Sequence, residues 1–445
     1  MTVLHPLFIQ RIQEQFPEES DAMIAAMDQP PKISVHAKGE ALSAFRSSQV
    51  THYAQGHFLK TRPVFTTDPQ FHLGKYYPQE SSSMVIGTLV KQISTEQSIR
   101  MVLDLCAAPG GKTILLHENL PSESVIYANE IHPKRNQVLQ ENLMKWGVVN
   151  AVVLQSDVSQ IKGDERWDLI LLDAPCSGEG LFRKDQAARL EWTPEQVIKC
   201  AGIQKYLVDE AYRLLAPNGV LIYSTCTFAE MENQDILSYC IEELGMEGWG
   251  HLEVPDEADQ IEVKGVAAWR FLPHRAQGEG FFCSVLKKPE AASSGRIKLA
   301  NDSFWQPLHK RDWPSVMPFV KDNDLERYWL NGKGEVFYSV ISPEYILPVA
   351  KMVQIGAQVG TLNKQIFTPH QGMILSDNTN QDIPRLEVSD DEALLVLRGE
   401  DWRMDDVNRS GWHIVQWQGM DLAWVKMVNG RVSNHYPKEW RIRHL

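Results

Sequence analysis

The stretch that decides the fold reads Asp104-Leu-Cys-Ala-Ala-Pro-Gly-Gly-Lys-Thr113. It overlaps the end of an apolar run, Met101–Leu105, and leads into a helix-forming window at residues 113–119. This order predicts a strand, a tight glycine-rich turn and a helix. In an open α/β sheet, ligands bind at the turns that follow the carboxyl ends of strands. The stretch therefore predicts a ligand loop.

The alternation of strand and helix patterns continues beyond this loop. Apolar strand candidates lie at Val125–Asn129, Ala151–Leu154, Leu169–Leu172 and Val220–Tyr223. Helical windows lie at 133–146, 194–215 and 230–244, and Pro217-Asn-Gly219 predicts a turn that ends the second of them. Trp269–Leu272 and Phe281–Leu286 are expected as further edge strands. This pattern predicts the α/β class with a doubly wound, mostly parallel sheet.

Two other parts flank the predicted sheet. Residues 5–27 predict two short helices, and Ile33–Val35 and Val64–Phe65 predict short strands of a small N-terminal α+β domain. After a small-residue linker, Pro289–Gly295, β-like pieces predict a mainly β C-terminal domain: Glu335–Tyr338, Ala393–Leu397, Trp412–Trp417 and Leu422–Met427. The expected domains are residues 1–95, 96–289, 290–365 and 366–445.

The composition is that of an ordinary globular protein. Of 445 residues, 43% are apolar and 23% are charged. No long apolar run predicts a membrane span, and the first residues lack the pattern of a secretory leader, so a cytoplasmic location is expected. The six cysteines form no C-x-x-C pair. We therefore expect reduced thiols and no metal site.

The net charge of −13 argues against a polyanionic partner, but most of it lies before residue 290. The last segment, from Lys426 to His444, is locally basic and includes Tyr436 and Trp440. Cations meet phosphates and aromatic rings stack on unpaired bases, so the segment suits RNA. A solvated C-terminal strand with ordinary surface charge explains it equally well.

The ligand loop does not match the common phosphate-binding motifs. A P-loop needs a glycine where Cys106 stands, and the dinucleotide pattern G-x-G-x-x-G is absent. The remaining interpretation is a nucleoside cofactor without phosphates.

Three carboxylates at successive strand ends agree with a nucleoside cofactor. Glu130 ends the second strand, where it can accept from ribose hydroxyls, and Asp157 follows the third, where it can accept from an adenine amino group. Asp173 closes the fourth strand. Each of them alone would most often be a helix cap or turn residue. Together they would attract a cationic sulfonium and repel phosphates.

Two cysteines follow apolar strands in the same way. Cys176 lies in Asp173-Ala-Pro-Cys-Ser-Gly-Glu-Gly180, and Cys226 lies in Tyr223-Ser-Thr-Cys-Thr-Phe228. Because the carboxyl ends of these strands meet at one crevice, both thiols are expected beside the ligand loop. A thiolate is the soft nucleophile that adds reversibly to an electron-poor carbon.

These three motifs, with Arg183-Lys-Asp185 and Tyr76-Tyr-Pro-Gln-Glu80, resemble the Sun-type (NOL/NOP/Sun) RNA cytosine-5 methyltransferases over about residues 75–289. The resemblance implies a Rossmann-like class I methyltransferase domain that uses S-adenosyl-L-methionine. The part after residue 289 looks PUA-like, as in bacterial RsmF-type enzymes that act on small-subunit ribosomal RNA. One departure lies in the N-terminal strand, where His36 and Ala37 stand in place of the family's arginine and asparagine.

The resemblance also implies roles for single residues. It makes Cys226 the nucleophile that adds to carbon 6 of cytosine and Cys176 the thiol that assists release. Asp173 is placed to assist at ring nitrogen N3 and also belongs to the cofactor contacts. The other implied cofactor contacts are Cys106, Ala107, Ala108, Pro109, Gly110, Gly111, Lys112, Glu130 and Asp157.

The expected partner is RNA. The extra C-terminal domain favours 16S ribosomal RNA, in an assembled small subunit rather than as naked RNA. Transfer RNA, which close relatives modify, is the first alternative, and a non-catalytic RNA-binding assembly factor is the second.

Overall fold

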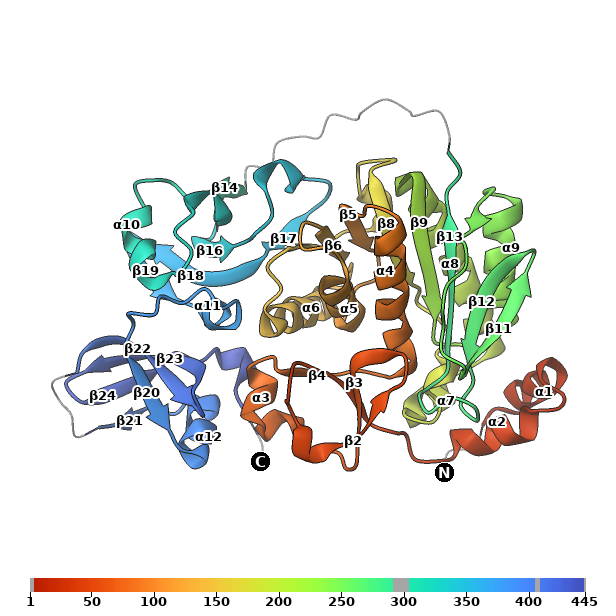
Figure 1. The fold of residues 1–445 in the computed structure, drawn as a ribbon, viewed down its shortest axis with the longest axis horizontal. Helices are drawn as coiled ribbons and strands as arrows, with labels where there is room; N and C mark the ends of the chain where they lie inside the picture. The colour runs from red at the N-terminus through yellow and green to blue at the C-terminus, as the bar shows by residue number, and fades with distance from the viewer. Residues whose placement is uncertain (1–3, 291–303, 405–408, 444–445) are drawn as a thin grey trace.

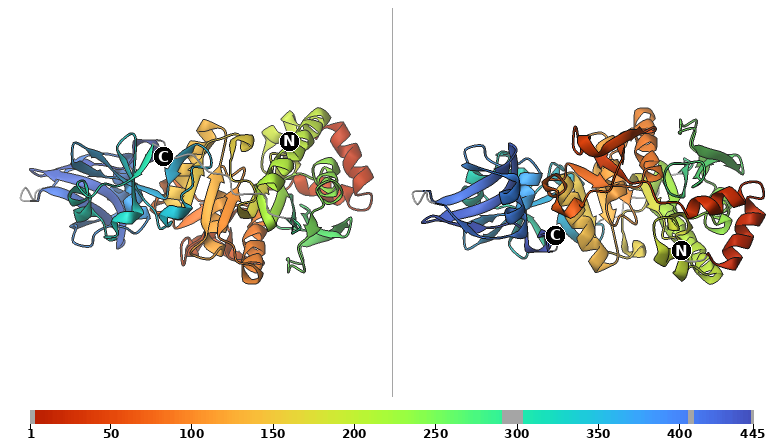
Figure 2. Two further views of the ribbon diagram at one scale, coloured as in Figure 1. Left: turned by 90° about the horizontal axis from the view of Figure 1, so that it is seen from above. Right: turned by 90° about the horizontal axis from the view of Figure 1, so that it is seen from below.

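The computed structural model describes residues 4–290, 304–404 and 409–443. The chain forms an elongated molecule with a large central sheet and the C-terminal part at one end (Figures 1 and 2). The N-terminal strands lie below the central sheet in Figure 1, beside the C-terminal part, and the first two helices lie at the opposite end. Within these residues no helix combines the length and apolar character needed to cross a membrane. Most of the linker predicted at Pro289–Gly295, from residue 291 on, lies outside the described residues.

The central sheet has ten strands and runs in the order β11-β12-β13-β9-β8-β5-β6-β7-β17, with β10 paired to β13. The five strands from β9 to β7 are parallel, and their neighbours at both edges are antiparallel. This confirms the predicted doubly wound, mostly parallel sheet. The parallel strands are β5 (Met101–Asp104), β6 (Val125–Asn129), β7 (Ala151–Leu154), β8 (Trp167–Asp173) and β9 (Leu215–Thr225). The others are β10 (Glu247–Gly248), β11 (Ala258–Val263), β12 (Val266–Phe271), β13 (Phe281–Lys287) and β17 (Met352–Ile355).

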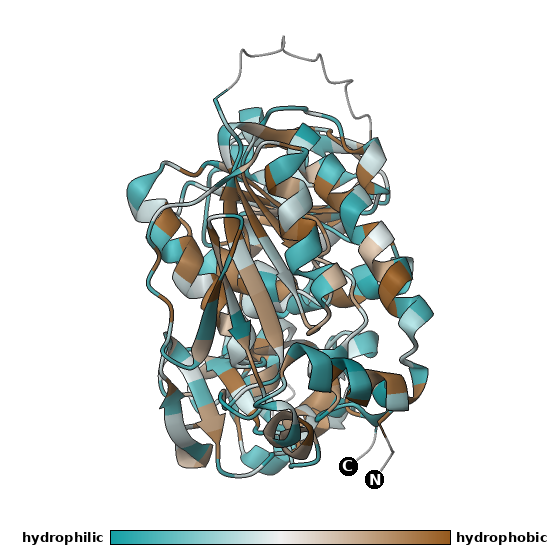
Figure 3. Cartoon of the chain, turned by 90° about the vertical axis from the view of Figure 1, so that its right-hand side faces the viewer, coloured by the Kyte–Doolittle hydropathy of each residue, from teal (hydrophilic) through white to brown (hydrophobic). Residues whose placement is uncertain are grey.

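Helices cover both faces of this sheet, and each face buries its own apolar core. One core packs α4 (Val85–Glu96), α5 (Gly111–Asn119) and α6 (Pro133–Trp146), and the other packs α8 (Pro194–Leu214) and α9 (Gln234–Glu242). Apolar colour follows the strands while the helices alternate between apolar and polar residues (Figure 3). Strands buried on both faces are expected to be continuously apolar, as β5, β6 and β7 are.

The turn predicted at Pro217–Gly219 is wrong in detail. Helix α8 ends at Leu214, and β9 runs through the three residues. Asn218 takes a positive φ of 63° and donates its N–H to the carbonyl of Lys288 at 3.1 Å. The register of β8 and β9 shifts between Trp167 and Leu169, so the turn residues form an irregularity inside the strand.

The N-terminal part contains α1 (Pro6–Gln15), α2 (Ser20–Met27) and α3 (Pro69–His72). Its four-stranded sheet has the order β2-β3-β1-β4, formed by β2 (Arg46–Val50), β3 (Tyr53–Leu59), β1 (Ser34–Ala37) and β4 (Tyr76–Pro78). The strand predicted at Val64–Phe65 is wrong, because Val64 is 64% exposed and Phe65 begins a short 3-10 helix. Pro63, which has no amide hydrogen to donate to a neighbouring strand, directly precedes Val64.

The C-terminal part has two five-stranded sheets, in the orders β14-β15-β16-β18-β19 and β20-β22-β23-β24-β21. Their strands are β14 (Trp305–Pro307), β15 (Tyr328–Asn331), β16 (Glu335–Tyr338), β18 (Ala357–Asn363), β19 (Ile366–Pro369), β20 (Arg385–Val388), β21 (Trp402–Arg403), β22 (Gly411–Trp417), β23 (Met420–Val428) and β24 (Arg431–Asn434). The helices are α10 (Trp313–Val316), α11 (Gln371–Leu375) and α12 (Asp390–Arg398). A short α7 (Gln186–Glu191) belongs to the central part and precedes α8 in the chain.

The strand predicted at Ala393–Leu397 is wrong, because these residues lie inside α12. Ser389 and Glu392 form a reciprocal capping box at the start of this helix, and Gly399 ends it with a positive φ of 77°. Both signals are typical of a helix, and they override the β tendency of the apolar run.

Candidate active site

The candidate site is a cavity of about 450 Å³ at the carboxyl edge of the central sheet, which we call the crevice. The loops that follow β5, β6, β7, β8 and β9 form its walls. Its volume lies within the range of small-molecule sites. The lining includes many of the side chains that the sequence singled out: Cys106, Ala108, Glu130, Asp157, Asp173, Cys176 and Cys226.

The ligand loop turns sharply below the crevice. The N–H of Ala107 donates to the carbonyl of Asn129, and the N–H of Gly110 donates to the carbonyl of Ala107, both at 2.8 Å. Gly110 has a φ of +112°, a conformation that favours glycine. Gly111 then begins α5. The predicted contacts Ala107, Pro109, Gly110, Gly111 and Lys112 belong to this turn and are not among the described residues that line the cavity.

Lys112 is paired with Asp173. Its Nζ lies 2.8 Å from Asp173 Oδ2, and Ser224 Oγ donates to Asp173 Oδ1 at 2.9 Å. Burial alone would lower the pKa of Lys112, but Asp173 and Cys226 outweigh it and the pKa is raised. The lysine of the loop is thus charged and neutralised by a carboxylate, which does not suit a phosphate cradle.

Glu130 and Asp157 both line the crevice. Glu130 accepts from the N–H of His132 at 2.9 Å and lies 3.2 Å from Arg135 Nη1. Asp157 accepts from the N–H of Ser159 at 3.0 Å and from Tyr206 Oη at 3.0 Å. The hydrogen bonds from Ser159 lower the pKa of Asp157. Both carboxylates therefore serve as local caps and also line the cavity.

The two cysteines meet inside the crevice. Their Sγ atoms lie 2.9 Å apart, and the N–H of Cys226 donates to Cys176 Sγ at 3.3 Å. The pairing of Asp173 with Ser224 in β8 and β9 brings the two loops together at their start. The N–H of Gly180 donates to the carbonyl of Cys226 at 2.8 Å, and a Cβ at Gly180 would lie only 2.3 Å from the Gly280 carbonyl oxygen. A glycine is needed there for the loops to approach.

The surroundings favour a neutral thiol at Cys176. Its hydrogen bond with Cys226 and its burial raise the pKa of Cys176, and the charge of Glu232 adds to the shift. Burial and nearby carboxylates also raise the pKa of Cys106, which makes that thiol a poor nucleophile.

Two fully buried glutamates hold the cysteine loops, and the sequence did not single them out. Glu179 accepts from Arg11 at 2.6 Å, from Trp192 Nε1 at 2.8 Å and from the N–H of Phe228 at 3.1 Å. Glu232 accepts from the N–H and the hydroxyl of Ser177 at 3.0 and 2.5 Å. Glu179 is inside a motif that was quoted only for its cysteine, and Glu232 follows the other cysteine motif closely.

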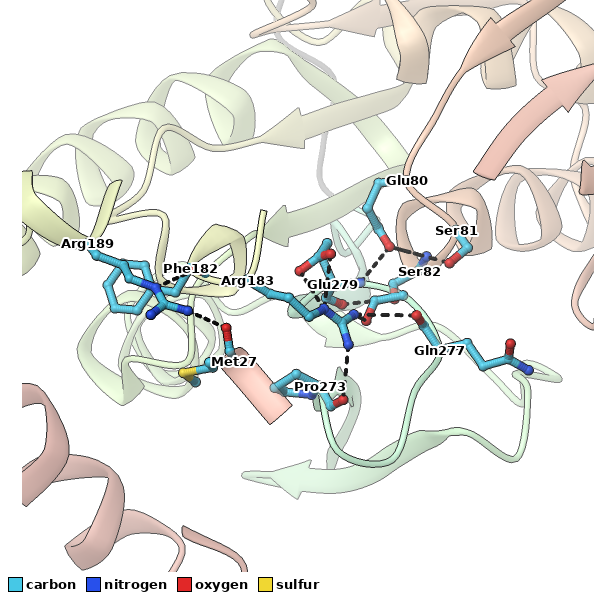
Figure 4. Close-up of polar contacts among 11 residues, drawn as sticks. Met27, Glu80, Ser81, Ser82, Phe182, Arg183, Arg189, Pro273, Gln277 and Glu279 are labelled. Carbon is cyan, nitrogen blue, oxygen red and sulfur yellow. Dashed lines mark hydrogen bonds and ion pairs between the residues drawn. The ribbon is translucent and has the colours of Figure 1, made fainter. Parts of the chain in front are cut away.

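The motif residues Glu80 and Arg183 meet through Glu279 (Figure 4). Arg183 Nε lies 3.2 Å from Glu279 Oε1, and its Nη2 donates to the carbonyl of Gly278. Glu80 accepts from the N–H of Glu279 at 2.7 Å. This network fixes the loop before β13, which continues to Gly280 beside the Cys226 loop. No local sequence pattern indicated Glu279.

The aromatic side chains of the basic C-terminal segment are buried. Tyr436 is 1% exposed and Trp440 is 7% exposed, and both belong to the core of the C-terminal domain. Tyr436 Oη lies 2.7 Å from His72 Nδ1, and Lys145 Nζ lies 5.1 Å from the Trp440 ring. These rings join the C-terminal domain to α3 and α6, so they are not available to stack on RNA bases. His444 lies outside the described residues.

The crevice fits a cationic nucleoside by its chemistry. Ile131, Val158 and Leu207 give it apolar wall for a flat ring, and three carboxylates lie at its edge. Lys112 is paired with Asp173 and Arg135 with Glu130, so one carboxylate charge remains in excess, and it favours a sulfonium over phosphates. Among the described residues, no cluster of three or more His, Cys, Asp or Glu side chains could hold a metal ion.

The doubly wound sheet and the crevice define a Rossmann-like class I methyltransferase, whose methyl donor is S-adenosyl-L-methionine. Residues 92–287 match the model of the 16S rRNA methyltransferase RsmB/F family. Residues 4–81 match the N-terminal domain of the 16S rRNA methyltransferase RsmF, and residues 384–442 match the methyltransferase RsmF PUA domain. The chain belongs to the RsmB/F family of 16S rRNA methyltransferases.

Full-length relatives agree. The chain is 28% identical over 461 residues to the ribosomal RNA small subunit methyltransferase F of Aliivibrio fischeri strain MJ11, covering 97% of this chain and 96% of the relative. It is 27% identical over 469 residues to the protein of the same name from Enterobacter sp. strain 638, covering 97% and 95%. A solved methyltransferase homolog from Pyrococcus horikoshii shares the fold with a TM-score of 0.53 and 26% identity, covering 63% of this chain and 94% of that chain. NSun6 from the same organism shares the fold with a TM-score of 0.54 and 19% identity, covering 64% and 98%.

Proposed function

We propose that this enzyme methylates carbon 5 of a cytosine in 16S ribosomal RNA through a covalent adduct with Cys226. The observation that carries the proposal is the pair of thiols 2.9 Å apart in a cavity that also contains Asp173, Glu130 and Asp157. A nucleophile and an assisting group within contact of each other are what addition and elimination on one ring require. The names of the full-length relatives support the choice of RNA.

Addition comes first. The Cys226 thiolate gives an electron pair to carbon 6 of the cytosine, and the electrons of the C5–C6 double bond become available at carbon 5. Asp173, held by Lys112 and Ser224, is the group we assign to ring nitrogen N3. Because N3 is an acceptor, the Asp173 carboxyl must carry a proton when the cytosine is bound, and the hydrogen bond that it then donates makes the addition easier.

When bound, S-adenosyl-L-methionine supplies an electrophilic methyl group on a sulfonium, and the electron pair of the broken bond stays on its sulfur. The backbone from Cys106 to Lys112 would lie along the cofactor. This stretch includes Ala107, Ala108, Pro109, Gly110 and Gly111. Glu130 would accept from the ribose hydroxyls and Asp157 from the adenine amino group. Each is a carboxylate on the cavity wall.

Release needs the proton on carbon 5 to leave, so that the C5–C6 double bond reforms and the C6–S bond breaks. We assign this step to Cys176. In the free enzyme its hydrogen bond with Cys226 is the largest cause of its raised pKa. Once Cys226 is a thioether, this cause and the negative charge of Cys226 are gone. Burial and the charge of Glu232 still raise the pKa of Cys176, so it must give up its own proton to water before it accepts the proton from carbon 5.

We propose that residues 96–289 perform this chemistry and that the N-terminal and C-terminal parts contact the RNA substrate. The boundary expected between residues 365 and 366 is wrong, because β19 shares one sheet with β14, β15, β16 and β18, and β17 belongs to the central sheet. The family models for the N-terminal and PUA domains support separate roles for the two ends. The target base must leave its stack to reach the crevice, which favours unpaired cytosines of the assembled small subunit.

The test is transfer of a labelled methyl group to RNA from cells that lack this enzyme, followed by bisulfite mapping. Small subunits, naked 16S ribosomal RNA and transfer RNA are assayed separately. Label at 16S cytosines is the expected result. Label in transfer RNA alone would move the substrate, and no label in any RNA would overturn the proposal.

A further inference from the structure

Cys176 is bracketed by a single buried carboxylate. Glu232 Oε2 accepts from the N–H of Ser177 at 3.0 Å and from Gln204 Nε2 at 2.8 Å, and the same Gln204 Nε2 donates to the carbonyl of Pro175 at 3.0 Å. Glu232 Oε1 accepts from Ser177 Oγ at 2.5 Å. The residues before and after Cys176 are therefore both held through Glu232.

Cys226 depends on other contacts. It directly follows β9, and its carbonyl accepts from the N–H of Gly180 at 2.8 Å. Two residues further on, the N–H of Phe228 donates to Glu179 at 3.1 Å. Its links toward the Glu232 carboxylate are indirect: the hydroxyls of Thr227 and Ser177 lie 2.8 Å apart, and the N–H of Cys226 donates to Cys176 Sγ at 3.3 Å. Loss of Glu232 would thus move Cys176 more than Cys226.

Burial makes this arrangement costly to lose. Glu232, Gln204 and Glu179 are each 0% exposed. A buried carboxylate is stable only while its hydrogen bonds are made, and the donors that it leaves behind become unsatisfied. The raised pKa of Glu232 reflects its burial, which the donors from Ser177 and Gln204 partly offset.

We propose that Glu232 is a positioning residue for the release step, because it fixes Cys176 through Ser177 and Gln204, while Glu179 serves the attack step by fixing the Cys226 loop. This inference rests on the proposed function of the two cysteines. It predicts that loss of Glu232 slows the release step, whereas loss of Glu179, which is equally buried, slows the attack step. Neither glutamate is among the described residues that line the crevice.

The experiment compares Glu232→Gln with Glu179→Gln in the full-length enzyme, with Cys176→Ala as the reference. Small subunits from cells that lack the enzyme are the substrate. Rapid quenching followed by a denaturing gel measures the covalent protein–RNA adduct, and labelled methyl groups measure turnover. The ratio of adduct to released methylated RNA is the readout that a general loss of stability would not change.

For Glu232→Gln we expect adduct formation within about 2-fold of the wild-type rate and release slowed about 10-fold or more, in the direction of Cys176→Ala. For Glu179→Gln we expect slower adduct formation and a normal rate of release. Gln204→Met removes the link from Glu232 to Pro175, one donor to Glu232 included, but keeps both hydrogen bonds from Ser177. It should slow release about 3-fold and serves if Glu232→Gln does not fold.

Two results would overturn the inference, and they differ. If Cys176→Ala accumulates adduct but Glu232→Gln and Gln204→Met release at the wild-type rate, the positioning role is wrong and the proposed function stands. If Cys176→Ala accumulates no adduct while the wild type methylates RNA, the role of Cys176 fails, and that of Glu232 fails with it.

Discussion

The crevice and the C-terminal seam both contain residue types that are typical of functional sites, but the two regions serve different ends. In the crevice, Asp173, Cys176 and Cys226 line a cavity and have one another as neighbours. In the C-terminal seam, which comprises Phe71, His72, Lys145, Tyr436 and Trp440, aromatic and basic side chains pack two parts of the chain together. The difference teaches that position at strand ends indicates chemistry, whereas a basic and aromatic composition serves a core equally well.

The sharpest test of the crevice is Cys226→Ala. Without the thiolate, neither the adduct nor carbon 5 methylation can form, so methyl transfer should fall by at least about 10⁴-fold. A filter assay with labelled cofactor measures it, and a denaturing gel checks for the adduct. Because Cys226 is only partly buried, the midpoint of thermal unfolding should change little. Residual methylation above a few per cent would contradict the assignment.

Cys176→Ala should separate the two thiols. Turnover should drop about 10²-fold or more, since the assisting group is lost, while the protein–RNA adduct accumulates. Quantifying adduct per enzyme on a denaturing gel measures this result. An adduct level equal to that of Cys226→Ala would show that the two cysteines do not divide the reaction.

Acid should lower the stability of the C-terminal seam without changing the residues of the crevice. His72 accepts from Tyr436 Oη at Nδ1 and donates from Nε2 to the Thr66 carbonyl, which requires its neutral form. Burial lowers the pKa of His72 to about 4, from 6.5. The unfolded chain therefore takes up a proton near pH 6.5 while the folded chain does not, and stability is lost as the pH falls from 6.5 toward 4.

This loss amounts to up to about 3 kcal/mol in the free energy of unfolding. His72→Gln should be less stable than the wild type at pH 7 but should lose less on acidification to pH 4.5. Urea denaturation followed by tryptophan fluorescence measures both values. An unchanged pH slope in His72→Gln would mean that His72 does not set the acid response of the seam.

Asp157→Asn tests the proposed cofactor contacts of the crevice separately from the two cysteines. In the cofactor contacts proposed above, Asp157 accepts from the adenine amino group, so replacing its carboxylate should lower cofactor affinity about 10-fold, or about 1.4 kcal/mol. Calorimetric titration with S-adenosyl-L-methionine measures it. The KM for RNA should stay the same, and Ser159→Ala, which removes only the hydroxyl cap, is the matched control.

The smallest effect is expected on the exposed face of the C-terminal domain. Lys426 is exposed and lies 5.6 Å above the Trp412 ring. We expect Lys426 to contact a phosphate of the RNA. The substitution Lys426→Gln should therefore weaken RNA binding about 2- to 3-fold and lower by about one the number of ions released on binding, which the salt dependence reports. Cofactor affinity should stay unchanged. An unaltered salt slope would remove this residue from the RNA contacts.

The sheet and the crevice could be predicted from the sequence because each motif follows an apolar strand and parallel strands end at one edge. The contacts that hold the crevice could not. Glu279 reaches Arg183 across the fold, and Arg11 reaches Glu179 from the first helix, so no local spacing indicates either pair. The helix at Ala393–Leu397 was missed for another reason, since its cap signals at Ser389 and Gly399 lie outside the apolar run.

Strand β17 has a consequence for how the protein is made. It covers the outer edge of β7, and Tyr127 of the neighbouring strand donates its hydroxyl to the carbonyl of Tyr345 at 2.7 Å. During synthesis, β7 leaves the ribosome long before β17, so the nascent catalytic sheet has an open edge until residue 355 has emerged. An open edge invites pairing with other chains. A chain that stops after β13 would thus lack the strand that protects its own catalytic domain from aggregation.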